Sequence, residues 1–381
     1  MGKEVSEARL LISVVFATYN EASYVRSSLS SILEQESRDF DIELLAIDGN
    51  SNDGTREILD EYSALDPRLQ VLVNEKRRAP FAFNLGLRKA RGELVCIFGA
   101  HTIYRKDYIA TCLRELIAHG AAGCGGRVIT APSRNTLQAR LAAWAISHPF
   151  GSSRKSFRTQ SEGFVDTVNY PVMRRELLIK AGGYDEELLR NQDNDLNQKL
   201  RSMGHKLYCT WKTSCFYSSK TNTKELLDYM RLTGFWNVIS FKKNPSSMAV
   251  RHFVPFIFLV ALFSSSLLAL TGVFLPVSYR IPALIPLIVL LGLHLGFGCL
   301  AGFQVAVREK SPGALWLPLV FLSLHIAYGY GTLSGFFSQL RTLLRSSESL
   351  VASCVRNLFF TATPQPDNRC SAASKCEMQN P

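Results

Sequence analysis

The stretch Leu10–Glu21, LLISVVFATYNE, is a run of β-branched and other apolar residues that ends at a polar turn. Such a run predicts a buried β-strand. In the next stretch, Glu21–Gln35, apolar residues recur at spacings of three and four, at Val25, Leu29 and Ile32, which predicts a helix with one buried face. A strand followed at once by an amphipathic helix is the repeating unit of an α/β fold.

The same unit recurs as far as residue 101. Apolar runs typical of strands alternate with segments of helical spacing, at residues 41–48, 55–65, 69–75, 79–91 and 92–101. Strands that alternate with helices predict an α/β domain with a doubly wound, mainly parallel sheet.

Polar residues close three of these strands. They are Thr18, Tyr19, Asn20 and Glu21 after the first strand, Asp48 at the end of the second, and His101 at the end of the fourth. In an open α/β sheet, ligands bind beyond the carboxyl ends of the strands, so we expect these side chains to face one crevice. Each residue alone has a simpler explanation, since an Asp before a Gly also starts turns.

The sequence lacks the glycine-rich loops that hold nucleotides in many α/β proteins. Neither G-x-G-x-x-G after the first strand nor G-x-x-x-x-G-K-[ST] occurs. A nucleotide would therefore be held by side chains: an aromatic face for the base, a carboxylate for its N–H or a ribose hydroxyl, and cations for the phosphates. Tyr19, Asp48 and the basic run Lys76–Arg78 provide these three kinds of group.

Three later segments carry no Asp, Glu, Lys or Arg: residues 253–275, 281–303 and 314–337. Each is about as long as the ~20 residues that cross a bilayer core, so they predict about three transmembrane helices. We expect a soluble domain (1–220), an interfacial helical segment (221–252), the membrane helices (253–340) and a polar tail (341–381).

The charge pattern predicts the orientation in the membrane. The formal net charge is +11, and Lys242, Lys243 and Arg251 crowd the entrance to the first span. Such residues stay on the cytoplasmic side and attract anionic membrane lipids. We expect a multi-pass protein of the plasma or inner membrane with its soluble domain in the cytoplasm. The side of the tail stays open, because basic residues occur both in the loop 305–312 and after residue 340.

Four motifs in order resemble glycosyltransferase family 2, the inverting enzymes with a GT-A fold. VVFATYNE resembles the opening strand, IDGNSNDGT the D-D/G-x-S-x-D-G-T segment, and APFAFNLGLRKARGELV the A-x-x-x-N-x-G…A-x-G-E segment. The stretch 165–208 resembles the acceptor-side half, with R-R-E, G-G-Y-D-E and the run RNQDNDLN. The resemblance covers about Leu10–Tyr217 and is closest to the ExoA-like subgroup of succinoglycan and exopolysaccharide assembly.

The resemblance implies roles for residues on the nucleotide side. Tyr19 would stack on the nucleobase and Asp48 would bind it. The full set implied for the nucleotide is Ala17, Tyr19, Glu21, Asp48, Arg78 and Asn84.

The resemblance places Asp193 at the position of the catalytic base, directly after Gln192. A sugar hydroxyl is a poor nucleophile, and a carboxylate within hydrogen-bond reach can take its proton as the anomeric carbon is attacked. The alternative is that Asp193 is a surface residue in the polar run 191–197.

The fourth strand departs from the family pattern. Most members end this strand on D-x-D, whose carboxylates hold a divalent cation against the diphosphate, whereas this chain has Gly99 and His101. His101 could bind a divalent cation, and imidazole suits Mn²⁺ better than Mg²⁺. Alternatively, His101 could hydrogen-bond a phosphate as imidazolium without metal. The leaving diphosphate needs stabilisation, and Arg77, Arg78 and Lys220 are candidates.

The segment after the soluble domain resembles a loosened Q-x-x-R-W element. By resemblance Gln192, Arg231 and Trp236 would lie on the acceptor or phosphate side. The alternative is an interfacial helix whose aromatic and basic residues lie among lipid head groups.

We therefore expect a membrane-bound inverting glycosyltransferase that moves a sugar from a nucleotide-sugar donor, UDP-linked in our hypothesis, to a lipid-linked saccharide in polysaccharide assembly. The alternatives are a processive polysaccharide synthase, which the missing Q-x-x-R-W disfavours, and a non-catalytic membrane subunit with a degenerate site at Gly99. No nucleic-acid partner is expected. Fold resemblance indicates chemistry more securely than substrate.

Overall fold

The computed structural model describes residues 9–360, with side chains described for residues 9–345. The chain divides into two compact units, Met1–Phe336 and Phe337–Pro381. The first unit holds the sheet and nearly all helices. The second holds, in the part that the structure describes, the remainder of the last helix, α12 (Leu317–Phe360).

The first half of the sheet is the predicted parallel α/β arrangement. Four strands lie in the order β3-β2-β1-β4 with parallel pairing throughout: β1 (Leu10–Thr18), β2 (Phe40–Asp48), β3 (Leu69–Val73) and β4 (Leu94–Gly99). The connecting helices are α1 (Ala22–Leu33), α2 (Thr55–Leu65) and α3 (Ala79–Lys89). The alternation of strands and helices read from the sequence is confirmed.

The second half of the sheet is mixed. Beyond β4 the order continues β8-β6-β9-β5, and β7 also pairs with β9; among these pairs only β6 with β9 is parallel. The strands are β5 (Thr102–Tyr104), β6 (Gly123–Ala131), β7 (Gly163–Val165), β8 (Val172–Arg174) and β9 (Leu207–Ser218). The helices are α4 (Tyr108–Ala118), α7 (Arg175–Lys180) and α8 (Gln192–Ser202). The parallel pairing predicted from the sequence thus holds for the first half and for β6 with β9, whereas the other pairs of the second half are antiparallel, so the sheet is mixed.

The sheet is buried on both faces. Val14 and Phe16 of β1 join an apolar cluster with α1 and α4, whereas Val15 joins a cluster on the other face with α3 and α8. A strand that is covered on both faces needs apolar side chains at nearly every position. This explains why β1, β2 and β4 read as continuous apolar runs rather than alternating ones.

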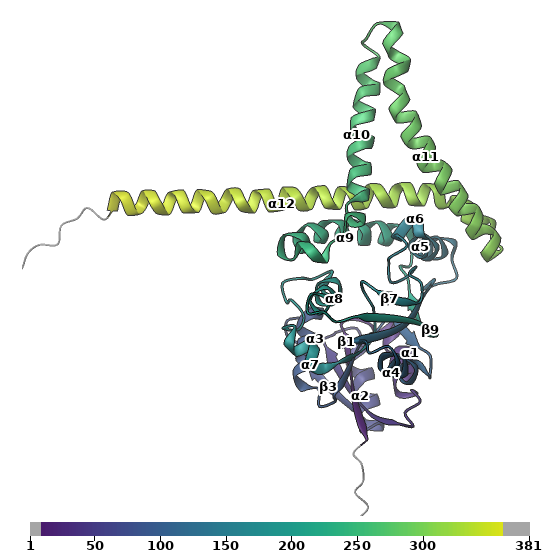
Figure 1. Cartoon of the computed structure of the whole chain (residues 1–381), viewed down its shortest axis with the longest axis vertical. Coiled ribbons are helices and arrows are strands. Elements are labelled where there is room, and N and C mark those ends of the chain that lie inside the picture. Colours follow the sequence, from purple (N-terminus) through teal and green to yellow (C-terminus); the bar gives the residue numbers. More distant parts are fainter. Residues whose placement is uncertain (1–8, 361–381) are drawn as a thin grey trace, which may run out of the picture. The chain divides into compact units, whose positions relative to one another are not determined.

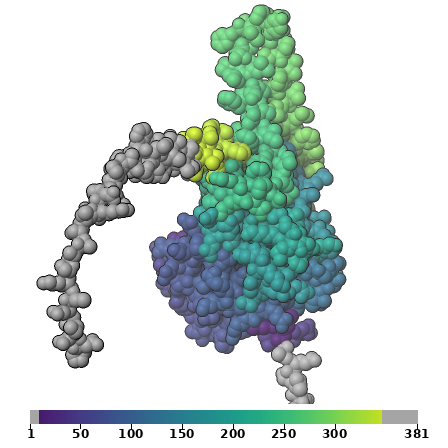
Figure 2. Space-filling model, turned by 60° about the vertical axis from the view of Figure 1, so that its left-hand side comes forward, coloured from purple at the N-terminus to yellow at the C-terminus, as the bar shows by residue number. Residues whose placement is uncertain are grey.

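Three helical segments are long and apolar enough to cross a membrane: Val254–Gly272, Val277–Glu309 and Pro312–Arg345. The first two are α10 (Val254–Gly272) and α11 (Val277–Glu309), which form a hairpin whose apolar surface is largely exposed (Figures 1 and 2). The third segment differs, since 39% of its most apolar window is buried, compared with 11% and 17% for the other two.

The third segment is more buried because it packs on the helices beside the sheet. Apolar residues from α5 (Leu137–Ser147), α9 (Thr223–Lys243) and the start of α12 form one cluster, which includes Trp144, Met230 and Phe321. The short helix α6 (Pro149–Ser152) follows α5. The crossing of α9 and α12 is close: a Cβ at Gly234 would clash with the carbonyl oxygen of Tyr328, and one at Gly331 with that of Arg231.

Helix α12 continues through residues 341–360, which the sequence analysis assigned to the polar tail. The rest of the predicted tail, residues 361–381, lies outside the described residues.

Substitution of Gly234 by Ala tests the α9–α12 contact. Ala normally favours a helix over Gly by about 1 kcal/mol. Here the added methyl group meets backbone that cannot rotate away, so we expect the substitution to destabilise the protein by about 1–3 kcal/mol. The thermal unfolding midpoint of the detergent-solubilised protein measures this change.

The matched control is Gly296→Ala in α11, where an added Cβ meets nothing within 4 Å. This variant should unfold at the wild-type temperature or above. An unchanged midpoint for Gly234→Ala would show that α9 and α12 do not approach this closely.

Candidate active site

The carboxyl ends of β1, β2 and β4 lie at the same level of the sheet. Thr18 pairs with Asp48, and Ala17 pairs with Gly99. Ligands of open α/β sheets bind at this edge, and the polar strand ends read from the sequence lie along it.

The turns after β1 and β2 are tied to each other. The backbone N–H of Asn20 donates to Ser51 Oγ at 2.9 Å, and Asn20 Oδ1 accepts from the N–H of Asn52 at 3.0 Å. Asn20 has a φ of 54°, in the left-handed region that Asn tolerates better than most residues. The two turns therefore form one rigid rim.

Tyr19 and Asp48 lie on this rim. The exposed ring of Tyr19 packs against Gly49, where a Cβ would come within 3.0 Å of it. Asp48 is buried, and its carboxylate accepts hydrogen bonds from the hydroxyl of Ser51 at 2.6 Å and from the Ser51 N–H at 3.2 Å. An exposed aromatic face beside an oriented carboxylate suits a nucleobase, and these two roles stay predictions.

His101 and Glu21 form a pair that the sequence did not indicate. His101 Nε2 lies 2.8 Å from Glu21 Oε1, and the ring of Tyr24 contacts the imidazole edge-on at 4.7 Å between centroids. The backbone N–H of Glu21 donates to Thr55 Oγ1 at 2.7 Å. The sequence predicts that Glu21 binds the nucleotide and that His101 binds a divalent cation or a phosphate; the structure places the two side chains within 2.8 Å of each other, and both roles stay predictions.

The residues around His101 do not fit a divalent-cation site built from the protein. Residues 9–345 contain no group of three or more His, Cys, Asp or Glu side chains arranged to hold a metal ion. At Gly99, where a D-x-D strand has its first carboxylate, a Cβ would lie 3.4 Å from the ring of Tyr170. Mg²⁺ in substrate sites is usually held by one or two protein groups, with substrate phosphates and water completing about six ligands. The Glu21–His101 pair would therefore hold a cation only together with a bound diphosphate.

Asp193 lies in the first turn of α8 and lines a pocket with Phe98, Gly99, Tyr170 and Tyr184. Burial alone raises the pKa of Asp193 to about 6, and neither a cation nor a hydrogen-bond donor among the described residues offsets that effect. A carboxylate with this pKa is ionised at neutral pH and is a stronger base than an exposed aspartate.

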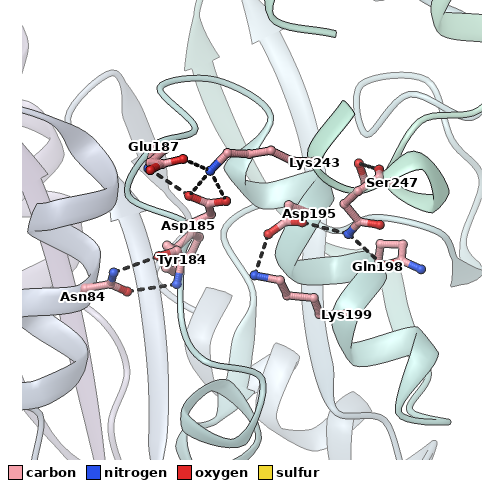
Figure 3. A network of polar contacts seen from close by, with 10 residues as sticks. Asn84, Tyr184, Asp185, Glu187, Asp195, Gln198, Lys199, Lys243 and Ser247 are labelled. Carbon is pink, nitrogen blue, oxygen red and sulfur yellow. Dashed lines mark hydrogen bonds and ion pairs between the residues drawn. The ribbon is translucent and has the colours of Figure 1, made fainter. Parts of the chain in front are cut away.

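Asp195, only two residues further, has a structural role. It is buried, pairs with Lys199 at 2.8 Å and accepts from Asn244 Nδ2 at 2.8 Å (Figure 3). Two aspartates of one helix turn therefore differ sharply: Asp195 is neutralised by a cation, whereas Asp193 is not.

Gln192 precedes Asp193, and its Oε1 is buried without a hydrogen-bond partner. Leaving a buried acceptor unpaired costs about 1–3 kcal/mol, so such a group is a candidate to meet a ligand. A substrate hydroxyl or N–H could donate to it.

The loop before α8 is held from two sides (Figure 3). Asn84 of α3 donates to the carbonyl oxygen of Tyr184 at 2.8 Å and accepts from the Tyr184 N–H at 2.9 Å. Lys243 of α9 pairs with Asp185 at 2.8 Å and also with Glu187. Asn84 thus positions the segment that leads to Asp193, and its assignment to the nucleotide stays a prediction.

The remaining residues of the sequence prediction lie apart from Asp193. Arg78 is exposed before the first turn of α3, and Arg231 lies on α9, with its Nε 3.9 Å from Asp228. Trp236, also on α9, packs edge-on against Phe235. Neither Arg231 nor Trp236 lines the Asp193 pocket. The sequence did not single out Arg158, which lies in no motif, or Arg190, although Arg190 opens the run RNQDNDLN.

Comparison with known sequences identifies a family domain in the first half of the chain. Residues 13–182 match the model described as glycosyl transferase family 2. A Methanococcus voltae protein, dolichyl N-acetyl-alpha-D-glucosaminyl phosphate 3-beta-D-2,3-diacetamido-2,3-dideoxy-beta-D-glucuronosyltransferase, is 26% identical over 85% of this chain and 96% of its own. Succinoglycan biosynthesis protein ExoA of Rhizobium meliloti is 26% identical over 63% of this chain and 70% of its own.

Comparison with solved structures agrees on the fold. The mannosyltransferase PcManGT from Pyrobaculum calidifontis, in complex with GDP-Man and Mn²⁺, aligns over 84% of this chain and 88% of its own. The TM-score is 0.52 at 18% sequence identity, a likeness that shows the fold alone. The GT-A arrangement, the family match and the named relatives agree: residues 13–182 of this chain form a glycosyl transferase family 2 domain.

Proposed function

We propose that this glycosyltransferase transfers one sugar, with inversion, from a nucleotide sugar to a lipid-linked saccharide. The observation that carries the proposal is Asp193, a carboxylate without a cation partner in a pocket at the carboxyl edge of the sheet. A base with a raised pKa at this place suits removal of a proton from an acceptor hydroxyl.

The proposed step is a direct displacement. The acceptor oxygen bonds to the anomeric carbon while the bond from that carbon to the diphosphate oxygen breaks. The proton of the hydroxyl passes to Asp193, and the nucleoside diphosphate leaves with the electron pair. Attack on the face opposite to the leaving group inverts the anomeric centre. Gln192 Oε1, which is buried and unpaired, can accept a hydrogen bond from the acceptor sugar.

A lipid-linked acceptor suits the membrane part of the molecule. The exposed apolar helices α10 and α11 follow α9 in the chain, and α9 is tied by Lys243 to the loop that leads to Asp193. The name of the Methanococcus relative contains a dolichyl phosphate acceptor, and that of the Rhizobium relative contains a polysaccharide. We propose that the catalytic domain faces the cytoplasm, because Lys242, Lys243 and Arg251 precede the first span.

The donor and the role of Asp193 are tested together. Membranes that contain the protein are incubated with a panel of radiolabelled nucleotide sugars, UDP-linked donors first, and label in the lipid extract is counted. We expect transfer from one donor, and a loss of about 10²–10⁴-fold in Asp193→Asn. Asp39→Asn, at an exposed position, should transfer at the wild-type rate.

Wild-type transfer by Asp193→Asn would refute the assignment of the base. Labelled polymer without lipid would indicate the processive alternative. Absence of transfer from every donor would favour the non-catalytic subunit.

The pH dependence follows from the pKa of Asp193. Below about pH 6 the carboxyl group is protonated in the folded enzyme and cannot accept the hydroxyl proton. We therefore expect the transfer rate at low donor concentration to be level above that pH and to fall towards tenfold per pH unit below it. An acidic limb with its midpoint near pH 4 would show that Asp193 is solvated like an ordinary aspartate.

The free energy of unfolding should depend on pH in the opposite sense to the transfer rate: it should fall as the pH rises. The pKa of Asp193 is higher when folded than when unfolded, so the folded state binds more protons between about pH 4 and 6, and stability falls as the pH rises. We expect Asp193→Asn to unfold at a higher temperature than wild type at pH 7.5, and at a similar temperature near pH 4. A lower midpoint at pH 7.5 would contradict a desolvated carboxylate without a cation partner.

A further inference from the structure

Three cationic side chains converge on Tyr229 of α9. The Arg190 guanidinium lies 4.7 Å from the centre of the Tyr229 ring, and Lys220 Nζ lies 5.5 Å from it. The charge of Arg158 also acts on the same tyrosine, whose pKa it lowers. The three cations come from the loop after α6, the loop before α8 and the residues after β9, so only the fold brings them together. We call these four residues the Tyr229 cluster.

The cations of the Tyr229 cluster are not within ion-pair distance of a carboxylate in residues 9–345. Among the described side chains, Arg158, Lys220 and Arg190 form no ion pair, whereas other basic residues, such as Lys212 and Lys243, pair with carboxylates at 2.7–2.8 Å. The nearby Glu225 interacts mainly with Thr221 and Asn222, and its charge interacts more weakly with that of Lys220. Like charges gathered without a close counter-ion are unfavourable at partly buried positions.

Arg158 is held by aromatic rings and keeps one donor unused. Its guanidinium lies 4.1 Å from the ring centre of Phe157 and 5.2 Å from that of Tyr217. Its Nε is buried and has no hydrogen-bond partner. Aromatic faces stabilise a guanidinium without neutralising it, so the positive charge remains available to an anion.

The pKa of the Tyr229 hydroxyl indicates a positive electrostatic potential at this place. Burial would raise the pKa of its hydroxyl, but the charges of Arg158, Arg190 and Lys220 together lower that pKa below its ordinary value. The positive potential at this point therefore outweighs the desolvation of a phenolate.

The Tyr229 cluster adjoins the strand edge where the donor diphosphate is proposed to lie. Tyr217, which contacts Arg158, pairs with Thr102, and the N–H of Ser218 donates to the carbonyl oxygen of His101 at 2.8 Å. Lys220 follows two residues later. Tyr170, which fills the space in front of Gly99, also senses the charge of Arg158.

We propose that Arg158, Arg190 and Lys220 form a phosphate-binding site for a substrate. Their positive charge would do part of what a metal ion bound by a D-x-D strand end would do, since this chain has Gly99 and His101 there. The anion is the diphosphate of the nucleotide sugar or the phosphate of the lipid-linked acceptor, which share this chemistry. The inference rests on the proposed function. Cations fixed in a partly dry site stabilise negative charge that develops on a leaving diphosphate.

Binding of two probes to the full-length protein in detergent, with EDTA present, tests the site. Inorganic pyrophosphate represents the diphosphate, and a polyprenyl phosphate in the same micelles represents the lipid; titration calorimetry measures both. We expect wild type to bind at least one probe in EDTA, and Arg190→Gln and Lys220→Gln each to weaken that binding about tenfold, or about 1.4 kcal/mol. Arg154→Gln removes an exposed charge outside the Tyr229 cluster and should change nothing.

The outcomes separate the two sources. Weaker pyrophosphate binding alone assigns the site to the donor, and weaker polyprenyl phosphate binding alone assigns it to the acceptor. Unchanged binding of both probes overturns the proposal, and so does binding that EDTA abolishes in wild type. Thermal unfolding of each variant excludes misfolding as the cause of a loss. Because binding is measured without turnover, a negative result here leaves the sugar-transfer assay free to support the proposed function.

Discussion

The parallel pairing of β1 with both β2 and β4 is the constraint on which the site depends. It places Ala17 beside Gly99 and Thr18 beside Asp48, so that three strand ends far apart in sequence open at one edge. Both faces of these strands are buried, and a slip of one residue would move each apolar side chain to the opposite face. Register, and with it the shape of the site, is therefore determined by core packing.

Asp193 and Asp195 show how the fold gives adjacent carboxylates different tasks. Asp195 is paired with Lys199 and helps to join α8 to the segment after α9, whereas Asp193 has no cation partner and keeps a raised pKa. An ion pair such as that of Asp195 helps to hold two elements together, whereas a desolvated carboxylate such as Asp193 costs stability and is a stronger base than an exposed one. The polar contacts of Asn84 and Lys243 hold the loop that leads into α8, the helix on which the desolvated Asp193 lies (Figure 3).

The charged side chains around the site differ in whether they have an ion-pair partner of opposite charge. His101 pairs with Glu21, whereas in residues 9–345 the cations of the Tyr229 cluster form no ion pair and contact aromatic rings. In the phosphate site that we propose, an anionic substrate would meet these cations beside α9 and the loops that precede it. The same helix packs closely against the start of α12, so the proposed phosphate site and one of the apolar helices share a common support.

The sequence by itself determined the parallel half of the sheet, the three apolar helices and the position of Asp193 in a family pattern, because periodicity, charge-free runs and motifs are local properties of the chain. It did not reveal the mixed half of the sheet, whose short strands β5, β7 and β8 carry too few residues for a pattern. Only the tertiary structure decided that Glu21 meets His101, that Asn84 holds the loop at Tyr184 and that three distant cations surround one tyrosine. Such encounters depend on how separate elements pack, and no spacing along the chain encodes them.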